Sequence, residues 1–142
     1  MKPFLKYWLP VILWCSLIFW LSSIQHLDTG WGLWDFILRK CAHMAEYGVL
    51  YLLARRAFAG TPSASWFDKL TTLSKVEGLR INPTMAGFVF AVLYAASDEF
   101  HQSFVPTRGP SVKDVMLDAA GAYIALRLRH WAVKLKNNEK HI

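Results

Sequence analysis

The sequence predicts an all-α fold, an integral membrane four-helix transmembrane bundle with a short cytoplasmic interfacial helix. Apolar residue types make up 54% of the 142 residues and charged types 18%, against about 25% charged in an average soluble domain. The apolar residues are grouped in blocks instead of recurring at amphipathic spacing. Several blocks approach the roughly 20 apolar residues that cross a bilayer as a helix. Lys and Arg collect between the blocks, as they do at membrane surfaces.

The first expected span covers residues 5–24, because the chain from Tyr7 to Gln25 carries no charge. Lys2 and Lys6 precede this block, as basic residues precede a secretory signal. The apolar block is too long for such a signal, and no cleavage site of small residues follows it. We therefore expect the block to remain as a membrane helix.

The second expected span covers residues 41–58, and Asp35 is a suitable N-cap for its helix. A cytoplasmic connection follows it. In this connection Ser65 and Asp68 have the spacing of a capping box. The apolar residues after them recur at helical intervals, which predicts a short helix on the inner surface of the membrane.

The third expected span covers residues 82–104. It begins with Asn82 as N-cap and Pro83 at the first helical position. The fourth covers residues 112–131, after Ser111 and Asp114 at capping-box spacing. No internal repeat is present, so residues 1–142 are expected to form one domain.

The distribution of basic residues predicts the orientation. In a four-span topology, twelve of the sixteen Lys and Arg residues fall on the side of the two termini and four on the other side. The more basic side faces the cytoplasm, so both termini are expected there. The net charge of +6 is then explained by contact with anionic lipid, and no nucleic-acid partner is expected.

Polar residues converge at the opposite, envelope-facing end of all four predicted helices. Residues three or four apart share a helix face, as Lys40, His43, Glu46 and Tyr47 do, and likewise Asp114 and Asp118. Small residues below the two aspartates, Gly121 and Ala125, allow close helix packing. Ionisable residues within membrane spans are usually paired or functional, so this end is the candidate site.

The residue types suggest roles within this site. The candidates for acid–base chemistry are His43, Glu46, Asp98 and Asp118. The candidates for substrate binding are Ser23, Gln25, Lys40, Tyr47, Glu99, Gln102, Arg108 and Asp114. We expect no metal and no cofactor, because His-x-x-Glu alone is a weak metal motif and no cysteine joins the group. A purely structural network that holds the bundle together is the alternative.

These residues also carry a family resemblance over nearly the whole chain. The chain resembles the VanZ-like membrane proteins in three segments. They are Ser22-Ser23 with Gln25; Lys40, His43, Glu46 and Tyr47; and Asp98-Glu99-Phe100-His101-Gln102 followed by Pro106, Arg108, Ser111, Asp114 and Gly121. Two positions depart from the family pattern: Ile24 separates the serines from Gln25, and Asp118 stands where Asn is common.

The resemblance implies a multi-pass protein of the bacterial inner membrane, in a family whose founding member is associated with low-level teicoplanin resistance. It supplies no reaction. Three functions therefore stay open: a non-catalytic cell-envelope protein in antibiotic resistance, which is slightly favoured, an enzyme that modifies a lipid-linked envelope substrate, and a small proton-coupled transporter. The expected partners are the lipid bilayer and a lipid-linked envelope precursor or lipoglycopeptide.

Overall fold

Over residues 2–24, 32–60, 82–105 and 111–139, the ranges that the computed structural model describes, the chain forms four helices and no strands. They are α1 (Lys2–Ser22), α2 (Leu33–Gly60), α4 (Pro83–Gln102) and α5 (Val112–Asn138). The all-α class predicted from the sequence is confirmed. The expected interfacial helix at Ser65 and Asp68 lies outside the described residues.

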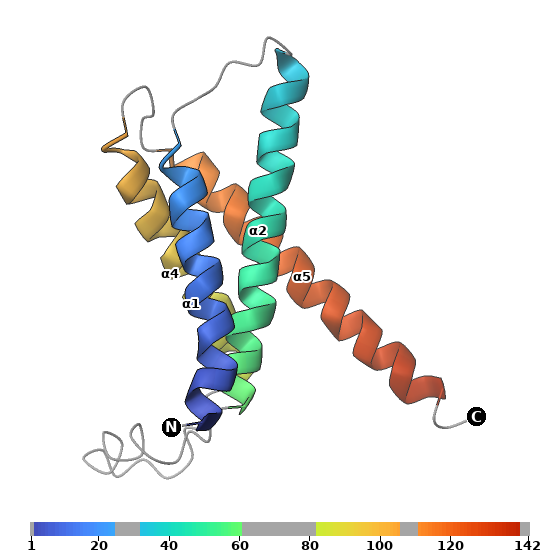
Figure 1. The fold of residues 1–142 in the computed structure, drawn as a ribbon. Coiled ribbons are helices and arrows are strands. Elements are labelled where there is room, and N and C mark those ends of the chain that lie inside the picture. Colours follow the sequence, from blue (N-terminus) through green and yellow to red (C-terminus); the bar gives the residue numbers. More distant parts are fainter. Residues whose placement is uncertain (1, 25–31, 61–81, 106–110, 140–142) are drawn as a thin grey trace, which may run out of the picture.

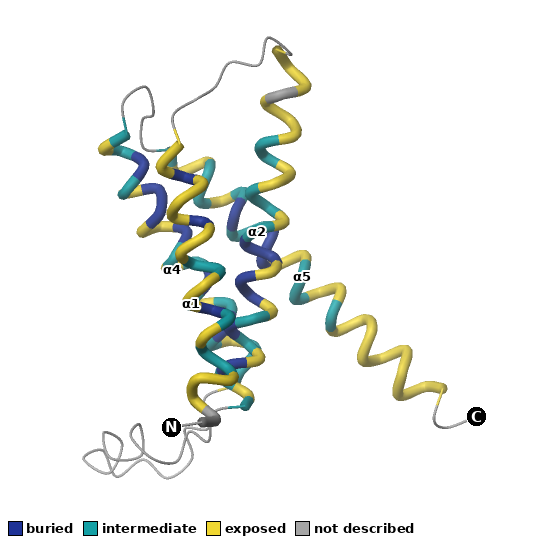
Figure 2. Tube along the Cα trace, in the orientation of Figure 1, coloured by how far each residue is buried: buried dark blue, intermediate teal, exposed yellow. Residues whose placement is uncertain are grey.

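Helix α2 is the centre of the arrangement, because α1, α4 and α5 all pack against it. Helices α1, α2 and α4 run side by side, whereas α5 crosses them obliquely (Figure 1). The amino end of α1 and the carboxyl end of α5 both lie toward the lower end of the molecule (Figure 1). The last turns of α5 leave the bundle and are exposed on all sides (Figure 2).

Small side chains let the helices approach closely around α2. Gly87, Ala91 and Ala95 follow one another at four-residue spacing on the buried face of α4. A Cβ atom at Gly87 would lie 2.8 Å from the backbone nitrogen of Arg55 in α2. The two backbones are therefore nearly in contact, as is common where small residues line helix interfaces in membranes.

The contact between α2 and α5 is equally close and uses the predicted stripe of small residues on α5. A Cβ atom at Gly121 would overlap the backbone of Met44, and one at Gly48 would lie 3.3 Å from the Gly121 carbonyl oxygen. The structure confirms that the small residues below the two aspartates allow close packing. This packing fixes the depth at which the polar ends of α2 and α5 meet.

The helix starts follow the sequence signals only in part. Asn82 caps α4 as expected, since its side chain accepts a hydrogen bond from the Thr84 N–H at 3.0 Å. Helix α2 begins at Leu33 and not after Asp35, because the Gly32 carbonyl already accepts from the Phe36 N–H. Gly32 has a φ of 54°, a conformation that glycine adopts without steric cost. The Ser111 hydroxyl makes no capping bond to α5.

One described helix is long and apolar enough to cross a membrane by itself, α1 over Phe4–Ser22, with a hydropathy of 1.7. Helices α2, α4 and α5 do not meet this criterion within the described residues. They carry the ionisable side chains of the candidate site and many small residues, and both lower the mean hydropathy. The expected four spans are thus not established by hydropathy.

Candidate functional site

Asp98 lies at the centre of the polar groups near the carboxyl end of α4. Its side chain accepts a hydrogen bond from the Ser22 hydroxyl at 2.6 Å and one from the Gln102 amide at 2.8 Å. Ser22 ends α1, and Gln102 lies one turn after Asp98 on α4. Asp98 is 3% exposed and Ser22 2%. A buried carboxylate is therefore held by one donor on each of its two oxygens.

A second pair of contacts joins α2 to the first turns of α5. The Lys40 ammonium forms an ion pair with Asp114. One turn deeper, His43 Nδ1 lies 3.7 Å from the Asp118 carboxylate, which is buried. The spacing of three residues on α2 and four on α5 brings both pairs to one interface. At this interface α2 thus presents two basic side chains to two acidic side chains of α5.

Glu99 connects α4 with the start of α5. Its Oε1 atom accepts a hydrogen bond from the Ser111 backbone N–H at 2.6 Å, and its side chain is buried. This bond takes the place of the side-chain cap that the sequence predicted at Ser111. The amino end of a helix favours an anion, so Glu99 stabilises the first turn of α5 from the neighbouring helix.

Tyr47 and Glu46 line the α2 side of Asp98. Both interact electrostatically with the Asp98 carboxylate. Tyr47 is fully buried, yet its hydroxyl has no partner in hydrogen-bond geometry among the described residues. The backbone carbonyl of Glu46 accepts a bond from the Trp14 indole at 3.0 Å, which ties this part of α2 to α1.

The structure thus brings most of the predicted site residues together. Asp118 interacts electrostatically with Asp98, Asp114, Glu99 and Lys40, although these residues come from three helices. We call the five carboxylates around this point the acidic cluster: Glu46, Asp98, Glu99, Asp114 and Asp118. The described basic groups beside it are Lys40 and the His43 imidazole, so the cluster carries more acids than bases.

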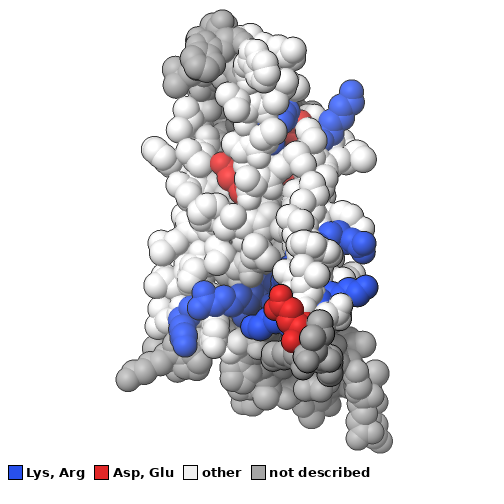
Figure 3. All heavy atoms as spheres, turned by 90° about the vertical axis from the view of Figure 1, so that its right-hand side faces the viewer, with Lys and Arg blue, Asp and Glu red and all other residues white. Residues whose placement is uncertain are grey.

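Charge is distributed unequally over the length of the molecule. Figure 3 shows Lys and Arg gathered mainly in the lower half of the surface, where acidic atoms are exposed as well, and further acidic atoms recessed among uncharged ones in the upper half. Most Lys and Arg side chains visible in this view thus lie away from the acidic cluster. Within the described ranges, no group of three or more His, Cys, Asp or Glu side chains is arranged to hold a metal ion.

The sequence predicted Ser23 as a binding residue, but the structure places Ser22 at the site instead and leaves Ser23 outside it. Ser23 is exposed and its hydroxyl bonds to the Phe19 carbonyl at 2.6 Å. Helical periodicity could have distinguished Ser22 from Ser23 in the sequence. Ser22 lies four residues after Ile18 and eleven after Val11, the two fully buried residues of α1, and so shares their face.

His101 is a polar residue that the candidate list did not contain. Its ring lies against Phe19 of α1 with 4.2 Å between ring centroids. Its Nδ1 atom is buried and has no partner among the described residues. Two predicted binding residues, Gln25 and Arg108, lie outside the described residues. Their place among the binding residues therefore remains a prediction.

Comparison with known proteins bears on these residues as a set. No curated protein and no solved structure matches the chain significantly. The family model described as VanZ/LLP1 matches residues 7–132, which include every residue of the acidic cluster and its contacts. Since this match covers most of the sequence, the chain belongs to the VanZ/LLP1 family.

Proposed function

We propose that this protein crosses the bacterial inner membrane four times, with both termini in the cytoplasm and the acidic cluster facing the cell envelope. Helix α1 supplies one apolar span, and the close packing of α4 and α5 on α2 favours a common transmembrane bundle. The more basic end of the molecule would face the cytoplasm. The polar ends of α2, α4 and α5 would then be sheltered from lipid by one another.

We further propose that the acidic cluster binds the polar head of an amphiphilic envelope molecule, either a lipid-linked wall precursor or a lipoglycopeptide antibiotic. One observation carries this proposal: among the described residues, a largely buried site at one end of the bundle holds more carboxylates than cations. An ionised carboxylate can accept more hydrogen bonds than the one or two that these groups receive from the protein, so the site favours hydroxyl, amide or ammonium donors from a ligand. Such binding would lower susceptibility to teicoplanin-type glycopeptides.

Binding without chemistry is favoured by the way in which the polar groups are held. Asp98 already accepts from Ser22 and Gln102, Glu99 from the Ser111 backbone, and Lys40 is paired with Asp114. A general base must be free to take a proton from the substrate, whereas these groups are engaged with one another. The arrangement suits recognition of a head group by a preorganised site.

The contact between Ser22 and Asp98 favours a second function, that of a transfer enzyme. A hydroxyl that donates to a carboxylate at 2.6 Å has the geometry of a nucleophile beside a base. In this alternative Ser22 would attack an acyl or phosphoryl centre of a lipid-linked envelope substrate while Asp98 takes the hydroxyl proton. The bond between that centre and its leaving oxygen would break, and Asp98 would return the proton to the leaving group. The test is turnover of such a substrate by the purified protein. Turnover that is lost in the Ser22→Ala variant would show that the protein is an enzyme and not only a binding protein.

Replacing Asp98 tests the proposed site. Asp98→Asn keeps the size of the side chain and removes one negative charge from the acidic cluster. We expect the melting temperature in detergent to change little, because the lost Gln102 bond is offset by reduced repulsion among the acids. Glycopeptide susceptibility of cells that express the variant should rise to that of cells without the protein.

The matched control is Glu139→Gln, which neutralises an exposed carboxylate at the far end of α5. It should leave both measurements unchanged. The competing account makes Asp98 a clamp between α1 and α4, and breaking a buried charge interaction costs about 3–5 kcal/mol. A large loss of stability in Asp98→Asn, or unchanged susceptibility at equal expression, would contradict the proposed site.

A further inference from the structure

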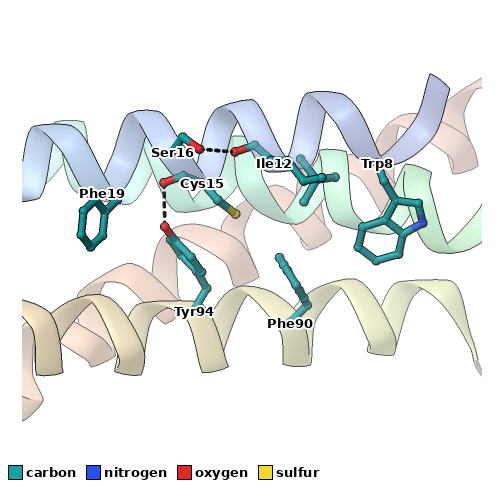
Figure 4. A pocket seen from close by; sticks show the side chains of 8 residues that line it. Trp8, Ile12, Cys15, Ser16, Phe19, Phe90 and Tyr94 are labelled. Carbon is teal, nitrogen blue, oxygen red and sulfur yellow. Dashed lines mark hydrogen bonds between the residues drawn. The ribbon is translucent and has the colours of Figure 1, made fainter. Parts of the chain in front are cut away.

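A groove opens on the side of the molecule between α1 and α4. It has a volume of about 450 Å³, within the range of roughly 300–1,000 Å³ that ligand pockets have. It exists because α1 packs mainly on α2 and touches α4 at few points. Figure 4 shows the two helices on opposite sides, with Phe90 and Tyr94 of α4 extending toward α1.

The surface inside the groove is apolar even where its lining residues are polar. The Tyr94 hydroxyl donates to the Cys15 carbonyl at 2.6 Å, and the Ser16 hydroxyl to the Ile12 carbonyl at 2.9 Å. Both bonds are drawn in Figure 4. Because these hydroxyls are already satisfied by backbone carbonyls, they offer little to a polar ligand. The groove therefore selects hydrocarbon.

The length of the groove matches one half of a bilayer. On α1 the lining extends from Trp8 to Phe19, twelve residues whose eleven steps rise about 16 Å in a helix. The hydrocarbon core of a bilayer is about 30 Å thick, so the groove is about as long as one leaflet is thick, and it lies across the middle of the expected span 5–24. A transmembrane helix of a partner would need the full thickness, whereas one lipid chain needs only its own leaflet.

The upper end of the groove leads into the acidic cluster. Phe19 lines the groove and lies against His101, and one turn farther along α1 Ser22 donates to Asp98. The lower end is closed by aromatic packing, since the centroid of the Trp8 ring lies 6.3 Å from that of Phe90 and 5.1 Å from that of Phe58. An apolar slot with one polar end is complementary to an amphiphile.

We infer that the groove holds one hydrocarbon chain of a membrane lipid whose polar head lies at the acidic cluster. The inference rests on the proposed function, because it assigns the head of the same ligand to that site. It adds the part of the ligand that the acidic cluster cannot recognise. In a bilayer the groove would open sideways to the surrounding hydrocarbon, which supplies the chain without a path through water.

Photocrosslinking of the full chain tests this inference. The protein is reconstituted into lipid nanodiscs that contain a small fraction of phosphatidylglycerol with a diazirine on one acyl chain. After irradiation, crosslinked positions are mapped by mass spectrometry. We expect labelling of the groove residues Cys15, Phe19 and Tyr94 to exceed that of Leu13 and Leu17, exposed residues of α1 outside the groove, several-fold.

Two variants fill the groove from an exposed lining position. Ser16→Trp should remove the excess labelling. Ser16→Leu adds a smaller side chain and should reduce the labelling, so it replaces Ser16→Trp if the indole impairs folding. The control Leu13→Trp places the same ring on α1 outside the groove and should leave the labelling unchanged. Equal labelling of all exposed α1 positions would overturn the inference, and so would labelling of the groove residues below that of Leu13 and Leu17, as expected if a second protein copy covers the groove.

The outcomes for the groove and for the acidic cluster are distinguishable. If only the groove inference fails, Asp98→Asn still changes antibiotic susceptibility while Ser16→Trp leaves lipid labelling as it was. If only the proposed function fails, Ser16→Trp removes the excess labelling while Asp98→Asn has no effect on susceptibility. The second result would leave the groove as a lipid site independent of the acidic cluster.

Discussion

At the scale of single residues, most side chains of the acidic cluster are held by partners from other helices. Lys40 is the one described lysine that pairs with the cluster, and its partner Asp114 lies 74 positions later in the chain. Asp98 and Glu99 accept from neutral donors, and Asp118 lies beside His43. Removing the lysine therefore leaves Asp114 among four further carboxylates with less positive charge to offset them.

The ion pair between Lys40 and Asp114 can be tested by removing each charge. Lys40→Met should destabilise the folded protein by about 1–3 kcal/mol, between the values for exposed and for buried pairs, because both partners are partly exposed. The double variant Lys40→Met with Asp114→Asn should recover part of this loss, since it also removes the unpaired charge. Denaturant unfolding in detergent measures the stability of both variants.

The control is Lys113→Met, which removes an exposed charge next to Asp114 in the sequence. A double variant as unstable as Lys40→Met would contradict a specific pair between Lys40 and Asp114.

At the scale of helices, patterns of apolar, small and capping residues predicted most of what the structure contains. Helical spacing placed His43 and Asp118 on facing sides of α2 and α5, and Asn82 with Pro83 marked the start of α4. The sequence was less informative where a contact comes from another helix. The Ser111 position is stabilised by Glu99 and not by its own hydroxyl, a tertiary contact that local spacing cannot reveal.

The choice between Ser22 and Ser23 shows the same limit at closer range. Both serines suit a polar helix end, and only the position of the buried face of α1 decides that Ser22 reaches Asp98. Hydropathy supports one of the four expected transmembrane spans, since α2, α4 and α5 do not meet the criterion that α1 meets. The family match over residues 7–132 is independent of that hydropathy.

A glycine at the α2–α5 contact gives the prediction for this scale. Gly121→Ala should destabilise the protein by about 1–3 kcal/mol, the usual cost of overpacking. The added Cβ atom would meet the Met44 backbone, which can yield only by separating the two helices. The separation would also pull His43 away from Asp118. Thermal unfolding in detergent and susceptibility in cells should therefore both change.

Gly48→Ala is the matched control for this substitution. Its Cβ atom would lie 3.3 Å from a carbonyl oxygen and 3.5 Å from the Ala125 side chain, so a shift of a few tenths of an ångström accommodates it. The higher helix propensity of Ala, worth about 1 kcal/mol, offsets the crowding. Equal losses in the two variants would show that the close approach at Gly121 is not what sets the α2–α5 spacing.

At the scale of the whole molecule, the two ends differ in what they present to their surroundings. The upper end contains the acidic cluster, and the groove between α1 and α4 leads into it from the side. The lower end carries most of the Lys and Arg visible in Figure 3 and, in the last turns of α5, exposed apolar and basic side chains together. Such a mixture is typical of helices at the surface of anionic membranes.

The central claim is that the acidic cluster faces the envelope, and cysteine accessibility in cells tests it most directly. In a Cys15→Ser, Cys41→Ser background, Lys113→Cys places a thiol at the exposed start of α5 beside Asp114, and Lys134→Cys places one near the opposite end of the same helix. A membrane-impermeant maleimide should label Lys113→Cys in intact spheroplasts and Lys134→Cys only after lysis. Labelling of Lys134→Cys but not Lys113→Cys in intact spheroplasts would place the acidic cluster in the cytoplasm and contradict the account.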